Sequence, residues 1–418
     1  MINKTKIGIN GFFLNKPNTG IGKYTRDVIL NAAKIAKDID FILYVNVDTT
    51  VFTKKDSQFY IELPYNIQIK HVFMIGFGTA GIKKTIWEQK SLLTSVKSDN
   101  CDAIIMPYPA HPWCKKWYKN GIYTISMIHD CIPWKDKDYQ VKFLSKLYNK
   151  MVKKSSSLVD EIWTVSETSK KDIVELFKIS KEKIRVFYNC VSREYMHKYT
   201  KGISEKVLKK FRLVKDGYFL YVGGYDPRKN VKKLVLGFEK YQKLTKDGTK
   251  KIPLVLCGGK ILKLKYYSDF DSIKSNDIVK TGFVSNEELA ILYQNACGYF
   301  TASKDEGFNI PSIEALFSNC PIYLSDIDVH HEIIGKVANF IDISSPDTIS
   351  KAFHLCESQN NICINDRFKC DTGERSIEKI KSVAKHKKEL MIKYTCKNAS
   401  GAVQARISAI NQIINNNE

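Results

Sequence analysis

The sequence lacks the features that mark membrane-spanning or secreted chains. No run approaches the roughly 20 apolar residues that a spanning helix needs. The basic start leads into Ile7–Leu14, without a long apolar stretch followed by a small-residue cleavage site. The 11 cysteines include no Cys-x-x-Cys pair, which is typical of a reducing compartment. We therefore expect a cytoplasmic location.

Metal-binding patterns are also scarce. Cys356, Cys363 and Cys370 recur every seven residues, but structural zinc normally uses ligand pairs closer together. Asp-x-Asp pairs stand at 136–138 and 326–328, where no phosphate-binding loop is expected beside them. We expect no metal ion and no other cofactor.

Acidic residues are too few to balance the basic ones. The chain has 66 Lys and Arg against 44 Asp and Glu, a formal charge of +22. Such a charge suits nucleic acid, an anionic membrane surface, or a solvated lysine coat. The lysines are dispersed, with local pairs such as Lys83–Lys84 and Lys115–Lys116, and no nucleic-acid-binding module is recognisable. A membrane surface is favoured, the lysine coat is the nearest alternative, and nucleic acid is not expected.

Short apolar segments alternate with helical patterns, which predicts an α/β protein with parallel sheets and crossover helices. The length of 418 residues suggests two domains, at 1–195 and 216–395, joined by a polar linker at 196–215. The expected strands are 6–10, 40–46, 67–72, 103–106, 123–128, 161–165, 184–188, 218–222, 254–257, 278–281, 298–301, 321–324 and 339–341. Expected helices in the first half are 22–37, 82–95, 142–157 and 167–177.

Open parallel sheets bind ligands beyond the carboxyl ends of their strands, so the loops there are candidate sites. Gly20 and Gly22 follow the first strand and would let an anion approach the backbone, although Gly-x-Gly is equally typical of an ordinary turn. His129 and Asp130 follow another strand, where a histidine is either structural or catalytic.

Two loops of the second half combine charged groups with a helix start. In one, Gly224, Arg228 and Lys229 precede Asn230, an expected helix cap, so cations and helix N–H groups could hold a diphosphate. The alternative is that Arg228 and Lys229 are ordinary solvated surface residues, as most neighbouring basic pairs are.

The second of these loops holds two carboxylates. Glu306 and Glu314 are separated by seven residues, and Pro311 favours a helix start between them. The helix N–H groups suit a diphosphate, and the carboxylates can accept hydrogen bonds from sugar hydroxyls.

This Glu-x7-Glu segment resembles the signature of retaining, nucleotide-sugar-dependent glycosyltransferases of family 4, with the bacterial mannosyltransferase-like group 1 enzymes among them. The similarity extends over about residues 6–335, through the glycine loop, the His-Asp pair, the Lys-Asn pair at 229–230, and segments 86–89, 164–170 and 282–293. It implies a GT-B fold, in which two Rossmann-like doubly wound domains face a central cleft and a helix near 402–415 packs back onto the first domain. The family usually has glycine where Asn309 stands.

The resemblance also assigns roles. Arg228 and Lys229 would stabilise the leaving diphosphate, Glu306 would bind the donor sugar, and Glu314 the ribose. The implied catalytic residues are His129, Asp130, Arg228, Lys229 and Glu306, with His129 contacting the donor sugar and Asp130 orienting it. The implied donor-binding residues are Gly20, Gly22, Gly224, Arg228, Lys229, Phe308, Asn309, Ile310 and Glu314.

The implied activity is metal-independent transfer of a hexose, with mannose from GDP-mannose favoured, to a glycan or lipid-linked glycan at the inner membrane face. Two classes remain as alternatives. A GT-B nucleotide-sugar epimerase or a phosphorylase would share the fold and the phosphate site. A noncatalytic, basic nucleic-acid-binding protein would explain the charge alone.

Overall fold

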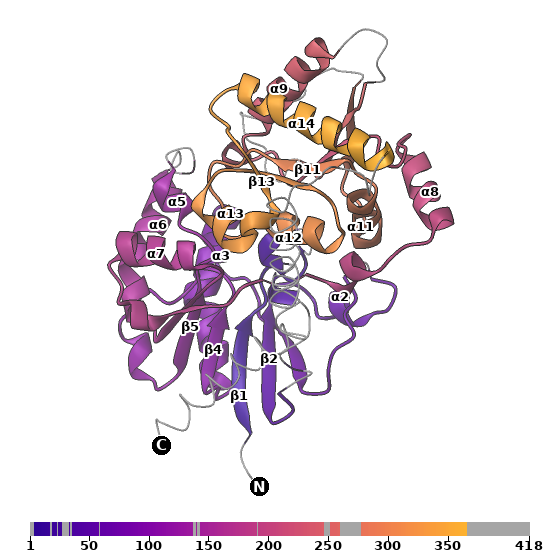
Figure 1. The fold of residues 1–418 in the computed structure, drawn as a ribbon. Helices are drawn as coiled ribbons and strands as arrows, with labels where there is room; N and C mark the ends of the chain where they lie inside the picture. Colours follow the sequence, from indigo (N-terminus) through magenta and orange to yellow (C-terminus); the bar gives the residue numbers. More distant parts are fainter. Residues whose placement is uncertain are drawn as a thin grey trace. The chain divides into compact units, whose positions relative to one another are not determined.

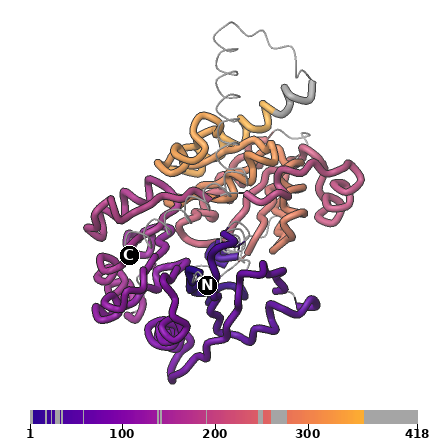
Figure 2. The backbone as a smooth tube through the Cα atoms, turned by 90° about the horizontal axis from the view of Figure 1, so that it is seen from below, coloured from indigo at the N-terminus to yellow at the C-terminus, as the bar shows by residue number. Residues whose placement is uncertain are grey.

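The chain forms two compact units, one within residues 1–188 and one within 189–396. A computed structural model describes residues 4–16, 19–22, 24–26, 33, 36–57, 59–136, 139, 143–189, 191–245, 251–259 and 277–365. Figures 1 and 2 trace the chain by residue number. The expected helix at 402–415 lies outside the described residues. The boundary between the units falls after residue 188, ahead of the expected linker 196–215. That stretch belongs to the second unit, where Leu208 of α8 (Lys201–Lys210) is buried.

Unit 1 is built on a seven-stranded sheet in which all pairings are parallel, in the order β3-β2-β1-β4-β5-β6-β7 (Figure 1). The chain order reverses between β1 and β4, and loops diverging at such a point leave room for a ligand. The strands are β1 (Thr5–Asn10), β2 (Ile39–Val45), β3 (Ile67–His71), β4 (Ala103–Met106), β5 (Tyr123–Met127), β6 (Glu161–Thr164) and β7 (Ile184–Val186). The helices are α2 (Thr50–Thr53), α3 (Ala80–Ile86), α4 (Leu92–Ser98), α5 (Ile132–Lys135), α6 (Phe143–Ser155) and α7 (Glu167–Phe177).

Unit 2 repeats this plan with six parallel strands, in the order β10-β9-β8-β11-β12-β13. Its reversal lies between β8 and β11. The strands are β8 (Phe219–Val222), β9 (Leu254–Cys257), β10 (Ile278–Gly282), β11 (Gly298–Thr301), β12 (Ile322–Ser325) and β13 (Asn339–Ile341). Beside α8, the helices are α9 (Val231–Leu244), α11 (Asn286–Gln294), α12 (Ile310–Phe317), α13 (Asp328–Ile333) and α14 (Pro346–Asn365). The prediction of an α/β protein with two parallel sheets is confirmed.

An aromatic core fixes the position of β8 and β11 in unit 2. Helices α9 and α14 lie side by side over one face of the sheet (Figure 1), and their apolar side chains meet those of the strands. Phe300 of β11 stacks on Phe353 of α14 at a ring-centroid distance of 4.4 Å and on Tyr323 of β12 at 4.5 Å. Burying such rings contributes about 1.5–3 kcal/mol each. This packing holds the strand ends that carry the candidate site.

The helix expected at 82–95 runs instead as α3, a π-helical turn at Trp87–Ser91, and α4. The wide turn serves two inward contacts. The Trp87 indole N–H donates to the carbonyl oxygen of Val72 at 2.8 Å, and the Gln89 amide donates to that of His111 at 3.1 Å. No helix among the residues that the structure describes is long and apolar enough to cross a membrane.

The loops after β8 and β9 touch through glycine. Gly258 has φ +117°, and a Cβ there would lie 2.3 Å from the Gly223 carbonyl oxygen. Gly258→Ala should therefore lower the free energy of unfolding by about 1–3 kcal/mol, measured by urea titration. Gly202→Ala is the control, since Gly202 lies in α8 with nothing within 4 Å of its would-be Cβ. Equal stabilities of the two variants would contradict the prediction.

Candidate active site

Two strand-to-helix loops of unit 2 lie at one edge of its sheet. Loop 223–230 joins β8 to α9, and loop 302–309 joins β11 to α12. Because β8 and β11 are parallel neighbours, their carboxyl ends meet at the same edge. The Lys304 N–H donates to the carbonyl oxygen of Arg228 at 2.8 Å, so the two loops are also bonded directly.

The first loop sets two cations side by side. Gly223 turns the chain with φ +148°, and the Tyr221 hydroxyl donates to the Gly224 carbonyl oxygen at 2.7 Å. The Asp226 carboxylate accepts from the Arg228 N–H at 3.2 Å and caps a short 3-10 turn at Pro227–Lys229. This turn presents both Arg228 and Lys229 to the second loop.

Asn230 does not act as the side-chain helix cap that the sequence predicts. It precedes α9, as expected of a cap, but adopts the left-handed conformation with φ 53°, and its side chain makes no capping hydrogen bond. The side-chain cap of this loop is Asp226, four residues earlier. Asparagine suits position 230 for a different reason: it tolerates the left-handed backbone region.

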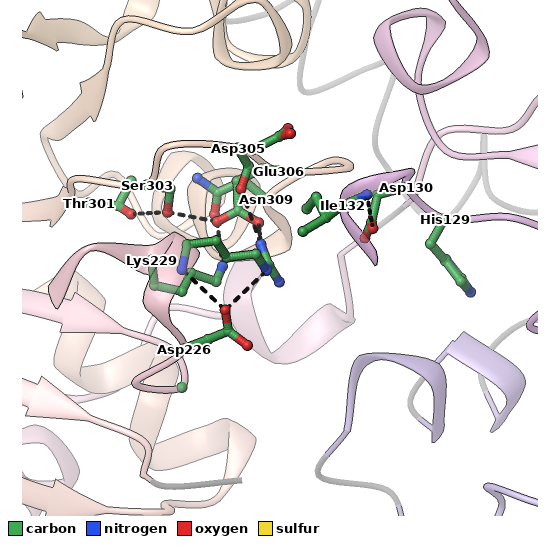
Figure 3. A network of polar contacts seen from close by, with 12 residues as sticks. His129, Asp130, Ile132, Asp226, Lys229, Thr301, Ser303, Asp305, Glu306 and Asn309 are labelled. Atoms are coloured by element: carbon green, nitrogen blue, oxygen red, sulfur yellow. Dashed lines mark hydrogen bonds and ion pairs between the residues drawn. The ribbon is translucent and has the colours of Figure 1, made fainter. Parts of the chain in front are cut away.

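The cations converge on Glu306 (Figure 3). The Arg228 Nη1 donates to Oε2 of Glu306 at 2.5 Å, and the Lys229 Nζ donates to Oε1 at 2.5 Å. Ser303 donates its hydroxyl to the same Oε1 at 2.7 Å. The side chains are 22% exposed for Arg228, 13% for Lys229 and 4% for Glu306, so the acid lies beneath the two cations.

Electrostatics keep Glu306 ionised. Burial alone would raise the pKa of Glu306, but Arg228, Lys229 and the hydrogen bond from Ser303 hold it well below its usual range. Burial lowers the pKa of Lys229, with Glu306 opposing the change. A carboxylate offers about four acceptor positions, and the contacts above use two on Oε1 and one on Oε2. Glu306 can thus hold both cations and still accept a hydroxyl through Oε2.

Asn309 stands where the family resemblance predicts glycine, and it adopts a backbone conformation that glycine favours. It adopts φ 67°, the left-handed region that glycine favours, directly before α12. Its side-chain amide donates to His330 Nε2 at 2.8 Å, while His330 Nδ1 donates to the Ser325 carbonyl oxygen at 2.8 Å. Burial lowers the pKa of His330, which favours the neutral ring this chain of bonds requires. Sequence reasoning missed His330, whose only signal was a histidine shortly after β12.

The remaining residues of unit 2 that are predicted to bind the donor lie on or next to α12. Glu314 is buried at 3% exposure, and the Tyr293 hydroxyl donates to its Oε2 at 3.4 Å. Phe308 is also buried, and Ile310 begins the helix. The structure therefore gathers Arg228, Lys229 and Glu306 in one cluster and places Glu314 against Tyr293.

In unit 1, the backbone anchors His129. Its Nε2 lies 2.9 Å from the carbonyl oxygen of Pro107 and donates to it, and its ring meets Tyr24 edge-on at 4.9 Å. The His129 carbonyl oxygen accepts from the Ser169 hydroxyl at 3.0 Å. Asp130 accepts from the Ile132 N–H at 3.1 Å (Figure 3). The ring orientation is thus fixed by Pro107, whereas Asp130 shapes the following turn.

Gly20 and Gly22, in the loop that follows β1, differ in the space that a side chain would have. A Cβ on Gly22 would lie 2.0 Å from the Lys16 carbonyl oxygen, so close packing of the loop on itself requires glycine there. Gly20 is exposed, with nothing within 4 Å of a would-be Cβ. A role for either in donor binding stays a prediction.

Cysteine and carboxylate groups form no metal site in the described part of the chain, where no three His, Cys, Asp or Glu side chains are placed to hold an ion. Cys363 and Cys370 lie outside the residues whose side chains are described. Metal independence remains a prediction.

Two family models of glycosyltransferases match the chain. Residues 204–369 match the family model "Glycosyl transferases group 1", and residues 45–195 match "Glycosyltransferase Family 4". The first match lies within unit 2, and the second lies in unit 1 up to residue 188 and ends just inside unit 2. The chain is a glycosyltransferase, which confirms the predicted enzyme class and contradicts the alternative of a noncatalytic nucleic-acid-binding protein.

Two relatives and one solved structure show which individual proteins the chain resembles. The O-antigen chain mannosyltransferase RfbU of Salmonella typhimurium is 28% identical over 79% of this chain and 84% of its own length. The O-antigen chain mannosyltransferase B of Escherichia coli is 26% identical over 59% of this chain and 67% of its own. Among solved structures, HepE of Anabaena in complex with UDP and glucose aligns with a TM-score of 0.65 at 13% identity, covering 97% of this chain and 100% of HepE. The fold is GT-B, as predicted.

Proposed function

We propose that this enzyme transfers mannose from GDP-mannose, with retention of the anomeric configuration, to a hydroxyl of a glycan or lipid-linked glycan. The observation that carries the proposal is the cluster of Arg228 and Lys229 on Glu306 at the carboxyl edge of the unit 2 sheet. The two O-antigen mannosyltransferases named above support mannose and a glycan acceptor. The UDP and glucose bound to HepE support a nucleotide-sugar donor without selecting the base.

The proposed chemistry follows from the charges. The bond between the sugar's anomeric carbon and the diphosphate breaks, and the bond to the acceptor oxygen forms on the same face. The acceptor proton passes to an oxygen of the leaving diphosphate, so no protein nucleophile is needed. Arg228 and Lys229 stabilise the negative charge that grows on the diphosphate, which a preorganised cationic site does better than water.

Glu306 has two tasks in this proposal. It holds the two cations at 2.5 Å, and it accepts a hydroxyl of the donor sugar through Oε2. The role proposed for His129, whose ring is held by Pro107, is contact with the donor sugar. We further propose that the enzyme works at the inner membrane face, where exposed basic segments such as Lys115–Lys116 meet anionic lipid.

A donor screen tests the proposal. GDP-mannose should raise the melting temperature more than UDP-, ADP- or dTDP-sugars, because a ligand at 100 times its Kd stabilises the folded state by about 2.7 kcal/mol. Transfer to a mannoside acceptor should give an α-linked product by NMR.

Each part of the proposal has its own contrary result. A larger rise in melting temperature with another nucleotide sugar would show that GDP-mannose is not the preferred donor. A β-linked product would exclude retention. Conversion of GDP-mannose into an isomeric nucleotide sugar without an acceptor would favour the epimerase alternative.

A further inference from the structure

A buried polar network lies behind loop 302–309, and His330 connects its two ends. His330 belongs to α13, outside both loops of the candidate site, and it is 0% exposed. Its Nε2 bonds to Asn309 at the end of the loop, and its Nδ1 bonds to Ser325 at the end of β12. The chemistry proposed above gives His330 no task.

One arm of the network ends at the turn before α12. The Asn309 amide donates to His330 Nε2 at 2.8 Å, and the Tyr299 hydroxyl donates to Asn309 Oδ1 at 3.4 Å. Asn309 has φ 67°, a backbone conformation that residues other than glycine adopt at a cost. The two side-chain bonds hold Asn309 in that conformation, so the first N–H groups of α12, which have no acceptor within the helix, keep a fixed direction.

The other arm of the network runs to Glu306. The Ser325 carbonyl oxygen accepts from His330 Nδ1, and the Ser325 hydroxyl donates to the Ser303 carbonyl oxygen at 2.6 Å. The Ser303 hydroxyl in turn donates to Glu306 Oε1 at 2.7 Å (Figure 3). All of these side chains are buried. His330 therefore reaches the start of the loop through Ser325 and its end through Asn309.

The acceptors fix the direction of the two bonds that His330 makes. A backbone carbonyl oxygen only accepts, so His330 must carry its proton on Nδ1. Its Nε2 is then an acceptor, and Asn309 must turn its NH2 group toward this atom. A buried network with every partner satisfied specifies one arrangement, whereas removal of one partner leaves a buried polar group unpaired. Loss of the ring should therefore disturb the loop as well as the packing of α13.

We propose that His330 is a positioning residue of the donor site, which holds both ends of loop 302–309 so that Glu306 and the start of α12 are placed to bind a nucleotide diphosphate. The ligand in this inference rests on the proposed function, whereas the residue is new to it and acts only through its neighbours. The inference also gives a use to asparagine where the resemblance predicts glycine, because the Asn309 side chain makes a bond to His330 that glycine lacks.

Replacing His330 with leucine should raise the dissociation constant for GDP by roughly tenfold, measured by isothermal titration calorimetry on the full chain. His111→Leu is the matched control. His111 is also 0% exposed and is bonded through both ring nitrogens, but it lies in unit 1, between Ser126 and Val152. Both variants should lose stability in urea, and only His330→Leu should lose affinity for GDP. An unchanged GDP affinity in His330→Leu would overturn the proposal.

Two conservative variants separate the two arms. In His330→Gln the side-chain oxygen can take the place of Nε2 and accept from Asn309. In His330→Asn the side-chain NH2 group can take the place of Nδ1 and donate to Ser325. Each variant should recover part of the GDP affinity that His330→Leu loses. If all three variants bind GDP equally weakly, the hydrogen bonds of His330 do not position the loop and the proposal fails.

A double-mutant cycle tests whether His330 acts through Asn309. Asn309→Gly keeps a residue suited to φ 67° but leaves His330 Nε2 without its donor. His330→Leu leaves the Asn309 amide without its acceptor, whereas the double variant removes both polar groups. The double variant should therefore bind GDP no more weakly than the weaker of the two single variants. Losses that add would show independent effects and would contradict the proposal.

Hydrogen exchange separates this inference from the proposed function. The backbone amides of loop 302–309 should exchange several-fold faster in His330→Leu than in wild type, and at the wild-type rate in His111→Leu. This measurement needs no nucleotide. Faster exchange in a chain that binds no GDP would count against the proposed donor and support the positioning role. Unchanged exchange in a chain that binds GDP normally would overturn the positioning role alone.

Discussion

Replacing Lys229 with alanine should lower the rate of sugar transfer by about two to three orders of magnitude, the usual cost of removing one preorganised group that stabilises transition-state charge. The Lys229 Nζ is 2.5 Å from Glu306 and only 13% exposed, so a bound diphosphate would meet it with little intervening water. Both kcat and kcat/KM should fall, since the charge on the diphosphate grows as the sugar departs. The measurement is GDP release at saturating acceptor.

The fold should survive this change. Arg228 still pairs with Glu306 at 2.5 Å, so the carboxylate keeps a cation. Lys240→Ala is the control: its side chain is 42% exposed on α9, the helix that follows the Lys229 loop, and pairs with Asp347. Wild-type turnover in Lys229→Ala would refute the assignment, and a rise in KM alone would reduce the lysine to ground-state binding.

The strands of both sheets could be predicted from the sequence with little error. Strands 103–106, 254–257 and 298–301 agree with β4, β9 and β11 at both ends. The reason is physical: a parallel strand covered on both faces is a short, continuous apolar run with polar or glycine boundaries. All four residues of β9 and of β11 are buried.

The contacts within the candidate site could not be predicted in the same way. Arg228 and Glu306 are 78 positions apart, and only the pairing of β8 with β11 brings them together. The π-helical turn at Trp87–Ser91 depends likewise on distant carbonyl groups that Trp87 and Gln89 reach. The suitability of asparagine at 309 was predictable, because it rests on a local backbone preference, and φ 67° confirms it.

Replacing Glu306 with glutamine should destabilise unit 2 by about 3 kcal/mol at neutral pH, near the lower end of the cost of breaking a buried ion pair from one side. The pKa of Glu306 is lower in the folded chain than in the unfolded chain. Its ionised form therefore adds stability at pH above its ordinary value of about 4.5, and this contribution is lost as the pH falls below that value. Urea titrations of wild type and Glu306→Gln should accordingly differ most near neutrality and converge in acid. A constant difference from neutral to strongly acidic pH would contradict the assigned ion pairs.

The same variant separates a diphosphate site from a merely structural ion cluster. Without the carboxylate, Arg228 and Lys229 lose the anion that partly neutralises them, although burial and Arg228 both lower the pKa of Lys229. An added diphosphate would then supply the missing negative charge, so GDP should raise the melting temperature of Glu306→Gln by more than that of wild type. Turnover should fall, because a neutral amide oxygen is a weaker acceptor for the proposed donor hydroxyl than an ionised carboxylate. A smaller GDP shift in the variant would show that the nucleotide phosphates do not reach these cations, and it would do so independently of any acceptor.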